Sequence, residues 1–284
     1  MNRANGRKVK KMSKKKCILG IVSALVSTII AAPVLVSILA KSVEDPYLQS
    51  VLLALIEVVA LILIIVLFGQ KDKLRSTVKS FGKGLIAGGV MAGTAVVMLV
   101  INTVRGITEV GIPKMGIMNS LLYVLILFLT GGVSEELMYR GVIMNFIREN
   151  MGESKKSMIT SMIISSFLFG AVHLINLMGM GTDDVVGTLC QVGYSMSLGF
   201  MLAAVYARSH NIWANILIHF IYDLSLMIYS GIFKNETVTV SSLAGEHSIV
   251  LISAAIFAAG IAVSMFLLRK NKIGECFDNA AAAV

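Results

Sequence analysis

Ionisable side chains interrupt three of the long apolar segments of this chain, and they fall into three clusters. The clusters are Glu135, Glu136 and Arg140; then His173, preceded by Phe169; then His219 with Asp223. An ionisable group inside a membrane-spanning helix is costly unless it is paired or hydrated, so such residues point to functional sites. Carboxylates and imidazoles that converge between helices can activate a water molecule and stabilise an oxyanion.

The spacing within the clusters separates their roles. Glu136 and Arg140 are four residues apart with the acid first, which favours an ion pair on one helix face. Adjacent helical residues point about 100° apart, so Glu135 should face a different partner. An unpaired carboxylate in apolar surroundings suits a general base or acid. His219 and Asp223 are also four residues apart and share a face.

A purely structural interpretation competes with this one. A buried Glu–Arg pair can serve packing alone, and histidines inside a membrane can simply hydrogen-bond to neighbouring helices. Each cluster taken alone leaves both interpretations open. The presence of three clusters in one chain favours a common functional site.

The composition indicates which elements carry these clusters. Of the 284 residues, 56% are hydrophobic and 14% are charged, whereas soluble domains are about half apolar and about a quarter charged. The apolar runs are about 20 residues long, enough for a helix to cross a ~30 Å hydrocarbon core, and longer than barrel strands. We therefore predict an all-α, polytopic transmembrane helical bundle with about eight spans. The predicted spans are 17–40, 48–69, 82–104, 117–147, 157–177, 187–207, 211–230 and 248–268, with a kink at Pro33.

The charge distribution predicts the orientation. The net charge is +9, but eight of the 25 basic residues lie in the first 16 positions, directly before an apolar run. With the N-terminus inside, 20 of the 25 basic residues fall in inner segments and four in outer ones, Arg105 among the latter. This positive-inside bias predicts a multi-pass cell-membrane protein with both termini cytoplasmic, and an even number of spans. The basic tail suits anionic lipid, and we predict no nucleic-acid partner.

The predicted organisation has five parts. They are a basic cytoplasmic tail (1–16), N-terminal transmembrane helices (17–112), a core with the polar clusters (117–230), a last transmembrane helix (248–268) and a cytoplasmic tail (269–284).

The three clusters together resemble the CPBP family of intramembrane proteases, also called CAAX protease and bacteriocin-processing or Abi proteins. The chain is similar to the type II CAAX prenyl endopeptidases of that family. The family pattern is EExxxR, then FxxxH, then HxxxN or HxxxD, on successive membrane helices. Glu135, Glu136 and Arg140 match the first element, and Tyr139 and Gly141 agree with its common form EExxYRG. The other two elements match at Phe169 with His173 and at His219 with Asp223. The resemblance covers roughly 117–230.

The resemblance implies a role for each residue. Glu135 would activate water with help from His173, and His219 with residue 223 would stabilise the oxyanion. Glu136 with Arg140 would orient the site. Residue 223 is Asp where many members have Asn, and a carboxylate repels an oxyanion unless it is protonated. Asp223 is therefore either neutral or an orienting partner of His219.

The resemblance also raises the question of a metal, because the family is often called a metalloprotease family. Two His and two Glu can in principle bind zinc, with Glu135, His173 and His219 as the ligands. However, the sequence has no HExxH motif to place two ligands and a base on one helix face. We expect metal-free catalysis, with zinc as the alternative.

Simple helix geometry exposes a difficulty. In straight helices Glu135 would lie about 27 Å from the outer end of its segment, His173 about 24 Å from the inner end, and His219 about 12 Å from the inner end. We therefore predict that the fourth helix projects into the cytoplasm past Arg140. We also predict that the fifth helix ends early in depth, with 178–186 folding back to the outer surface.

Three functions stay open at this stage. The first is an intramembrane endopeptidase acting on a peptide or protein substrate near the bilayer, such as a prenylated tail or a leader peptide. The second is a catalytically silent immunity or scaffold protein of the same fold. The third is a transporter, although transporters more often show repeat symmetry and paired broken helices, and no repeat is evident.

Overall fold

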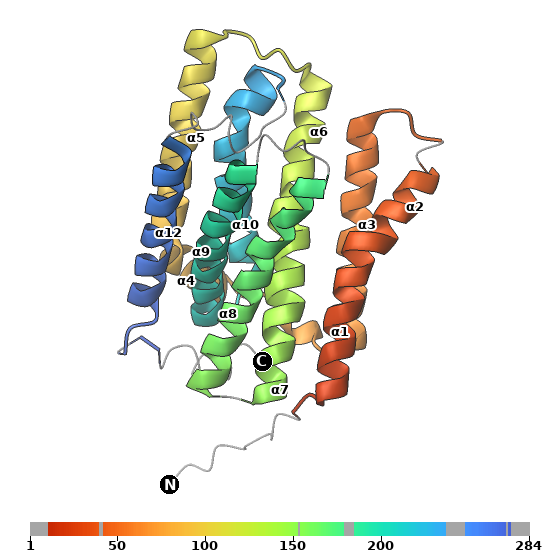
Figure 1. Cartoon of the computed structure of the whole chain (residues 1–284), viewed down its shortest axis with the longest axis vertical. Coiled ribbons are helices and arrows are strands. Elements are labelled where there is room, and N and C mark those ends of the chain that lie inside the picture. Colours follow the sequence, from red (N-terminus) through yellow and green to blue (C-terminus); the bar gives the residue numbers. More distant parts are fainter. Residues whose placement is uncertain are drawn as a thin grey trace.

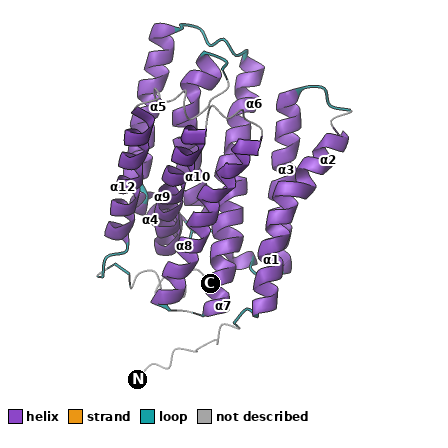
Figure 2. Ribbon diagram, in the orientation of Figure 1, coloured by secondary structure: helices purple, strands orange, loops and turns teal. Residues whose placement is uncertain are grey.

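The computed structural model describes residues 11–39, 42–152, 154–178, 185–236, 248–270 and 272–273. The secondary structure in these ranges is helical, and no strand occurs within them. Within these ranges, eight helices are long and apolar enough to cross a membrane. They are Lys14–Leu39, Pro46–Leu67, Gly89–Glu109, Ile117–Met151, Lys155–Leu177, Val185–Ser209, Ile212–Phe233 and Val250–Leu267. Figures 1 and 2 show the long helices side by side in a bundle. The predicted all-α bundle with an even number of spans is confirmed, and the chain is a multi-pass membrane protein.

The first span changes its helical winding before Pro33. The α-helix α1 (Lys14–Val26) passes into a π-helical turn, η1 (Ser27–Ala31), and continues as α2 (Ala32–Leu39). Proline has no amide hydrogen and its ring crowds the carbonyl four residues earlier, here that of Ile29 in η1. The visible bend between α1 and α2 (Figure 1) follows from this, as the predicted kink required.

The second span starts at a capped proline, whereas short helical segments precede the third span. The helix α3 (Pro46–Leu67) begins with a proline after the N-cap Asp45, whose carboxylate accepts from two backbone amides. A short 3₁₀ turn, η2 (Lys71–Leu74), and α4 (Val78–Ala87) precede α5 (Gly89–Glu109).

Two details of the predicted third span were wrong. It does not start at 82, because α4 ends before Gly88 and α5 begins after it. It also continues past 104, so Arg105 lies in a helix and not in an outer loop. The reason is local pairing: Arg105 Nε lies 2.9 Å from Glu109 Oε1 one turn later, and Glu109 accepts a hydrogen bond from the Tyr229 hydroxyl.

The fourth span is one continuous helical run of 35 residues, Ile117–Met151. It consists of α6 (Ile117–Leu127), the π-helices η3 (Phe128–Ser134) and η4 (Leu137–Met144), and α7 (Asn145–Met151). At about 1.5 Å per residue the run is about 50 Å long, well beyond a ~30 Å hydrocarbon core. This length agrees with a helix that projects from the membrane, as predicted.

The fifth span changes from an α-helix to a 3₁₀ helix at the motif formed by Phe169 and His173. The α-helix α8 (Lys155–Ala171) ends directly before the 3₁₀ segment η5 (Val172–Met178), which contains His173. The predicted fold-back at 178–186 lies mostly outside the described residues. The sixth span, α9 (Val185–Ser209), packs against α8 and against the last helix, α12 (Ser248–Leu267).

The seventh span is fastened at both ends. It comprises α10 (Ile212–Met227) and the π-helix η7 (Ile228–Phe233). At its start, Asn211 Nδ2 donates to the hydroxyls of Ser76 and Ser80 at 2.6 and 2.8 Å. At its end, Tyr229 donates to Glu109 and its ring lies under the Arg105 guanidinium, 4.1 Å from the ring centroid. Near the middle, Asn102 Nδ2 donates to the carbonyl of Ser225 at 2.7 Å.

Burial is concentrated in the segments that carry the polar clusters. All eight residues of η4 are buried, and α9 and α10 contain most of the other buried positions. The surfaces of α1, α2, α3, α5 and α12 expose many large apolar side chains, as lipid-facing helices do. The core of the bundle is therefore built around the fourth, sixth and seventh spans.

Close packing of α8 on α9 depends on a glycine. A Cβ at Gly170 would lie 2.6 Å from the carbonyl oxygen of Val192 and 3.0 Å from the amide of Met196, whereas a Cβ at Gly193 would meet nothing within 4 Å. We predict that Gly170→Ala destabilises the protein by about 1–3 kcal/mol, because the two backbones must separate. The matched variant Gly193→Ala should leave stability unchanged or slightly higher. Equal thermal unfolding midpoints in detergent for the two variants would contradict this packing.

Candidate active site

The glutamates lie between two π-helical segments of the fourth span. Glu135 and Glu136 are the two residues that separate η3 from η4. A π turn inserts an extra residue and rotates the side chains that follow it, and such turns are frequent at functional sites. The directions of the two carboxylates therefore depend on local winding that an ideal helix would not have.

The predicted ion pair is present. Arg140 Nη1 lies 2.7 Å from Glu136 Oε1, and both side chains are fully buried. Arg140 Nη2 donates to the carbonyl of Gly199 on α9 at 2.8 Å. A buried charge is tolerated only with such partners, so the pair ties the fourth span to the sixth.

Glu136 also binds the seventh span. Its Oε1 lies 2.9 Å from His219 Nδ1, and its Oε2 accepts from Asn215 Nδ2 at 3.1 Å. Asn215 donates as well to the carbonyl of Leu202 on α9, at 2.8 Å. Glu136 thus fixes the orientation of the His219 ring, a role that sequence analysis assigned more generally to Glu136 with Arg140.

The other nitrogen of His219 faces the remaining two carboxylates. His219 Nε2 is 3.7 Å from Glu135 Oε2 and 3.7 Å from Asp223 Oδ2. These separations are too long for direct hydrogen bonds, and a water or substrate atom between the groups would bridge them. Glu135 and Glu136 therefore face opposite nitrogens of one imidazole.

Solvent access divides the carboxylates into two kinds. The side chains of Glu135 and Asp223 keep 33% and 25% of their surface accessible, while Glu136 and Arg140 keep none. The open side of the cluster is therefore the side where His219 Nε2, Glu135 and Asp223 meet. The closed side holds the ion pair that supports them.

Phe169 connects the histidines to the ion pair. Its ring packs edge-on against Tyr139, His173 and His219, with centroid distances of 5.0, 6.0 and 5.6 Å. The Arg140 guanidinium lies 5.0 Å from the same ring. His173 is thus brought beside the site through Phe169, but within the described residues no hydrogen bond or ion pair joins its side chain to the carboxylates.

Gly131 makes room for Asp223. A Cβ at this position would clash with Asp223 Oδ2, so a larger residue would push the carboxylate out of its present place. The neighbouring Gly132 packs against Phe220 and the carbonyl of Ile216. Sequence analysis assigned these glycines no role in the site.

Sequence analysis also missed two polar residues. Asn215 precedes His219 by four residues and Asp223 by eight, so a polar stripe on one helix face was a usable pattern. Glu57 is an acid within the second span that lies outside the three motifs, and its carboxylate accepts from Ser134 at 2.9 Å.

The donors do not assemble as a metal site. Within the part of the chain that the structure describes, no group of three or more His, Cys, Asp or Glu side chains is placed to hold a metal ion. The set considered for zinc, Glu135, His173 and His219, is therefore not arranged as ligands around one point.

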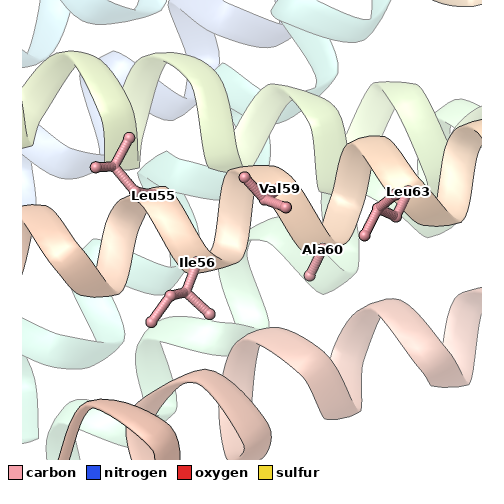
Figure 3. A pocket seen from close by; sticks show the side chains of 5 residues that line it. All are labelled: Leu55, Ile56, Val59, Ala60 and Leu63. Atoms are coloured by element: carbon pink, nitrogen blue, oxygen red, sulfur yellow. The ribbon is translucent and has the colours of Figure 1, made fainter. Parts of the chain in front are cut away.

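A separate groove lies on the surface of α3. Leu55, Ile56, Val59, Ala60 and Leu63 line it, with a volume of about 350 Å³ (Figure 3). Its lining is apolar throughout and comes from one helix, so it lacks the groups needed for hydrolysis. The polar cluster between the fourth and seventh spans is the candidate site.

Comparison with known families agrees with this placement. Residues 117–225 match the family described as type II CAAX prenyl endopeptidase Rce1-like. The match spans all the motif residues, from Glu135 to Asp223, and it confirms the resemblance of this segment to the CAAX protease family. A comparison with curated proteins finds no match.

The buried ion pair yields a stability prediction. Arg140→Met should destabilise the protein by about 3–5 kcal/mol, because Glu136 would remain buried without its cation. Arg105→Met is the matched control, since its pair with Glu109 is about half exposed and should contribute about 1 kcal/mol or less. The free energy of unfolding in mixed micelles measures both.

The double variant Glu136→Gln with Arg140→Met removes both charges and should recover part of the loss. Equal destabilisation by Arg140→Met and Arg105→Met would show that the pair does not support the bundle.

Proposed function

We propose that this protein is an intramembrane endopeptidase that hydrolyses a peptide bond near the membrane with a water activated by Glu135. One observation carries the proposal: His219 Nε2 faces the accessible carboxylates of Glu135 and Asp223 while Nδ1 is held by the closed Glu136–Arg140 pair. The family match over residues 117–225 supports a protease of this kind.

The reaction uses these side chains in sequence. Glu135 takes a proton from a water molecule lying between it and His219, and the hydroxide attacks the scissile carbonyl carbon. The protonated Glu135 then delivers that proton to the departing amine, so the proton balance closes. His173, beside His219 across Phe169, helps to position the water.

The oxyanion is stabilised from α10. With both ring nitrogens protonated, His219 donates through Nδ1 to Glu136 and through Nε2 to the oxyanion. Asp223 in its protonated form donates a second hydrogen bond, as the amide of Asn would. Because Glu136 already orients His219, Asp223 is not needed for that task.

The substrate is a peptide or protein segment at the membrane, such as a prenylated tail or a leader peptide. The protein lies in the cell membrane with both termini in the cytoplasm, where 20 of the 25 basic residues then fall. Hydrolysis proceeds without a metal ion in this proposal, since general base and oxyanion groups are supplied by side chains.

The central prediction concerns Glu135. Glu135→Gln should reduce peptide cleavage by about a hundredfold or more, because the amide cannot accept the proton from water. The substrate is found by trapping with this variant, and cleavage by the wild type is then followed by peptide mass spectrometry. The matched variant Glu109→Gln changes an acid outside the site and should cleave normally.

Two outcomes would favour the rival functions. Unchanged biological function in a Glu135→Gln variant that inserts normally would favour a scaffold or immunity protein. Solute movement without cleavage in reconstituted vesicles would favour a transporter.

Asp223 yields a second prediction. Asp223→Asn should keep cleavage within about tenfold of the wild type and extend it to higher pH, because the amide donates at every pH. Asp223→Leu should lose most activity. A pH–rate profile of the three proteins makes the comparison, and an inactive Asn variant would exclude the donor role.

A further inference from the structure

Glu57 is an acid in the middle of a membrane-spanning helix that the reaction above does not use. It lies about 16 Å along α3 from Pro46, close to half of the ~30 Å hydrocarbon core. It is half-buried, and α3 packs there against η3 and η4 of the fourth span. An ionisable residue at this depth is costly and calls for a functional explanation.

The contact of Glu57 leads directly to the general base. Its Oε2 accepts from Ser134 Oγ at 2.9 Å. Ser134 is buried, ends the π-helix η3 and immediately precedes Glu135. Glu57 therefore contacts the side chain of the residue that directly precedes Glu135.

The hydroxyl of Ser134 has an obvious alternative partner. Serine and threonine in helices commonly donate to the carbonyl three or four residues earlier. Thr130 does so, donating to the carbonyl of Ile126 at 2.7 Å. For Ser134 the corresponding acceptor is the carbonyl of Thr130, and that oxygen already accepts the amide of Glu135.

The amide bond from Glu135 to Thr130 spans five residues, which is the defining bond of a π turn. Glu57 draws the Ser134 hydroxyl toward α3 and away from this carbonyl. The Ser134 hydroxyl has this acceptor at 2.9 Å, so it does not compete for the carbonyl of Thr130. The π turn thus stays intact, and the direction of the Glu135 side chain stays fixed.

We propose that Glu57 is a positioning residue, which holds Ser134 so that the π turn aims Glu135 at the site. The proposal rests on the proposed function, in which Glu135 is the general base. It extends the working part of the molecule to α3, outside the segment 117–225 that matches the protease family.

The test uses the whole chain in detergent and five variants. Glu57→Leu and Ser134→Ala each remove the contact between the two side chains. The double variant removes the same single contact, so its two substitutions should not add. We expect each single variant to lower kcat about tenfold or more with KM changed by less than about threefold, since small misplacements of a catalytic group are costly. The double variant should be no worse than the worse single one.

Glu57→Gln is the conservative variant. Its amide oxygen still accepts from Ser134, so it should keep kcat within about threefold of the wild type. Asp72→Leu is the control, because Asp72 is an acid outside the site whose pair with Arg75 is half exposed and lies within one segment. It should leave kcat unchanged.

A second readout does not need a substrate. A hydrophobic carbodiimide reacts with membrane carboxyl groups, and peptide mass spectrometry gives its rate of reaction at Glu135. We expect this rate to change about threefold or more in Ser134→Ala and in Glu57→Leu, and to stay constant in Glu57→Gln and Asp72→Leu.

The outcomes separate the two proposals. If the wild type cleaves no peptide, the proposed function fails, while the carbodiimide rates still test Glu57. Unchanged rates at Glu135 in Ser134→Ala would overturn the positioning role. Additive losses in the double variant, or a Glu57→Gln variant as poor as Glu57→Leu, would overturn it as well.

Discussion

Arg140 and Glu136 form an ion pair with no accessible surface in the centre of the bundle. The remaining hydrogen bonds of the pair reach two other helices. Arg140 reaches the carbonyl of Gly199 on α9, and Glu136 reaches His219 and Asn215 on α10. Removing either partner of a buried charge pair is costly, so the pair and its hydrogen bonds constrain how the three helices meet. The closed pair holds His219 in place, and Glu135 and Asp223 face the other nitrogen of the same ring.

The fold and most of the site could be predicted from the sequence. The sequence has two strong patterns: eight apolar runs of membrane-crossing length and basic residues concentrated on one side. Both arise because unsatisfied backbone groups and misplaced charges are energetically costly in a bilayer. The Glu136–Arg140 pair followed from a spacing of four on one helix. His219 and Asp223 followed from the same rule.

Other features could not be read from spacing. The ideal helix predicts that Glu135 and Glu136 diverge, but π turns on both sides let them address the two nitrogens of His219. Gly131 matters through a partner on another helix 92 residues away, Asp223, and single-helix patterns contain no such information. Asn215 was missed because a neutral amide stands out less than a charge in an apolar segment.

The seventh span has a further consequence for access to the site. Its start is held by Ser76 and Ser80, its middle by Asn102, and its end by Glu109 beneath Arg105. A helix that is hydrogen-bonded at its start, middle and end has little freedom to move away from the bundle. Under the proposed function, an extended peptide would therefore reach His219 past other helices, and the seventh span would form a fixed wall of the binding site.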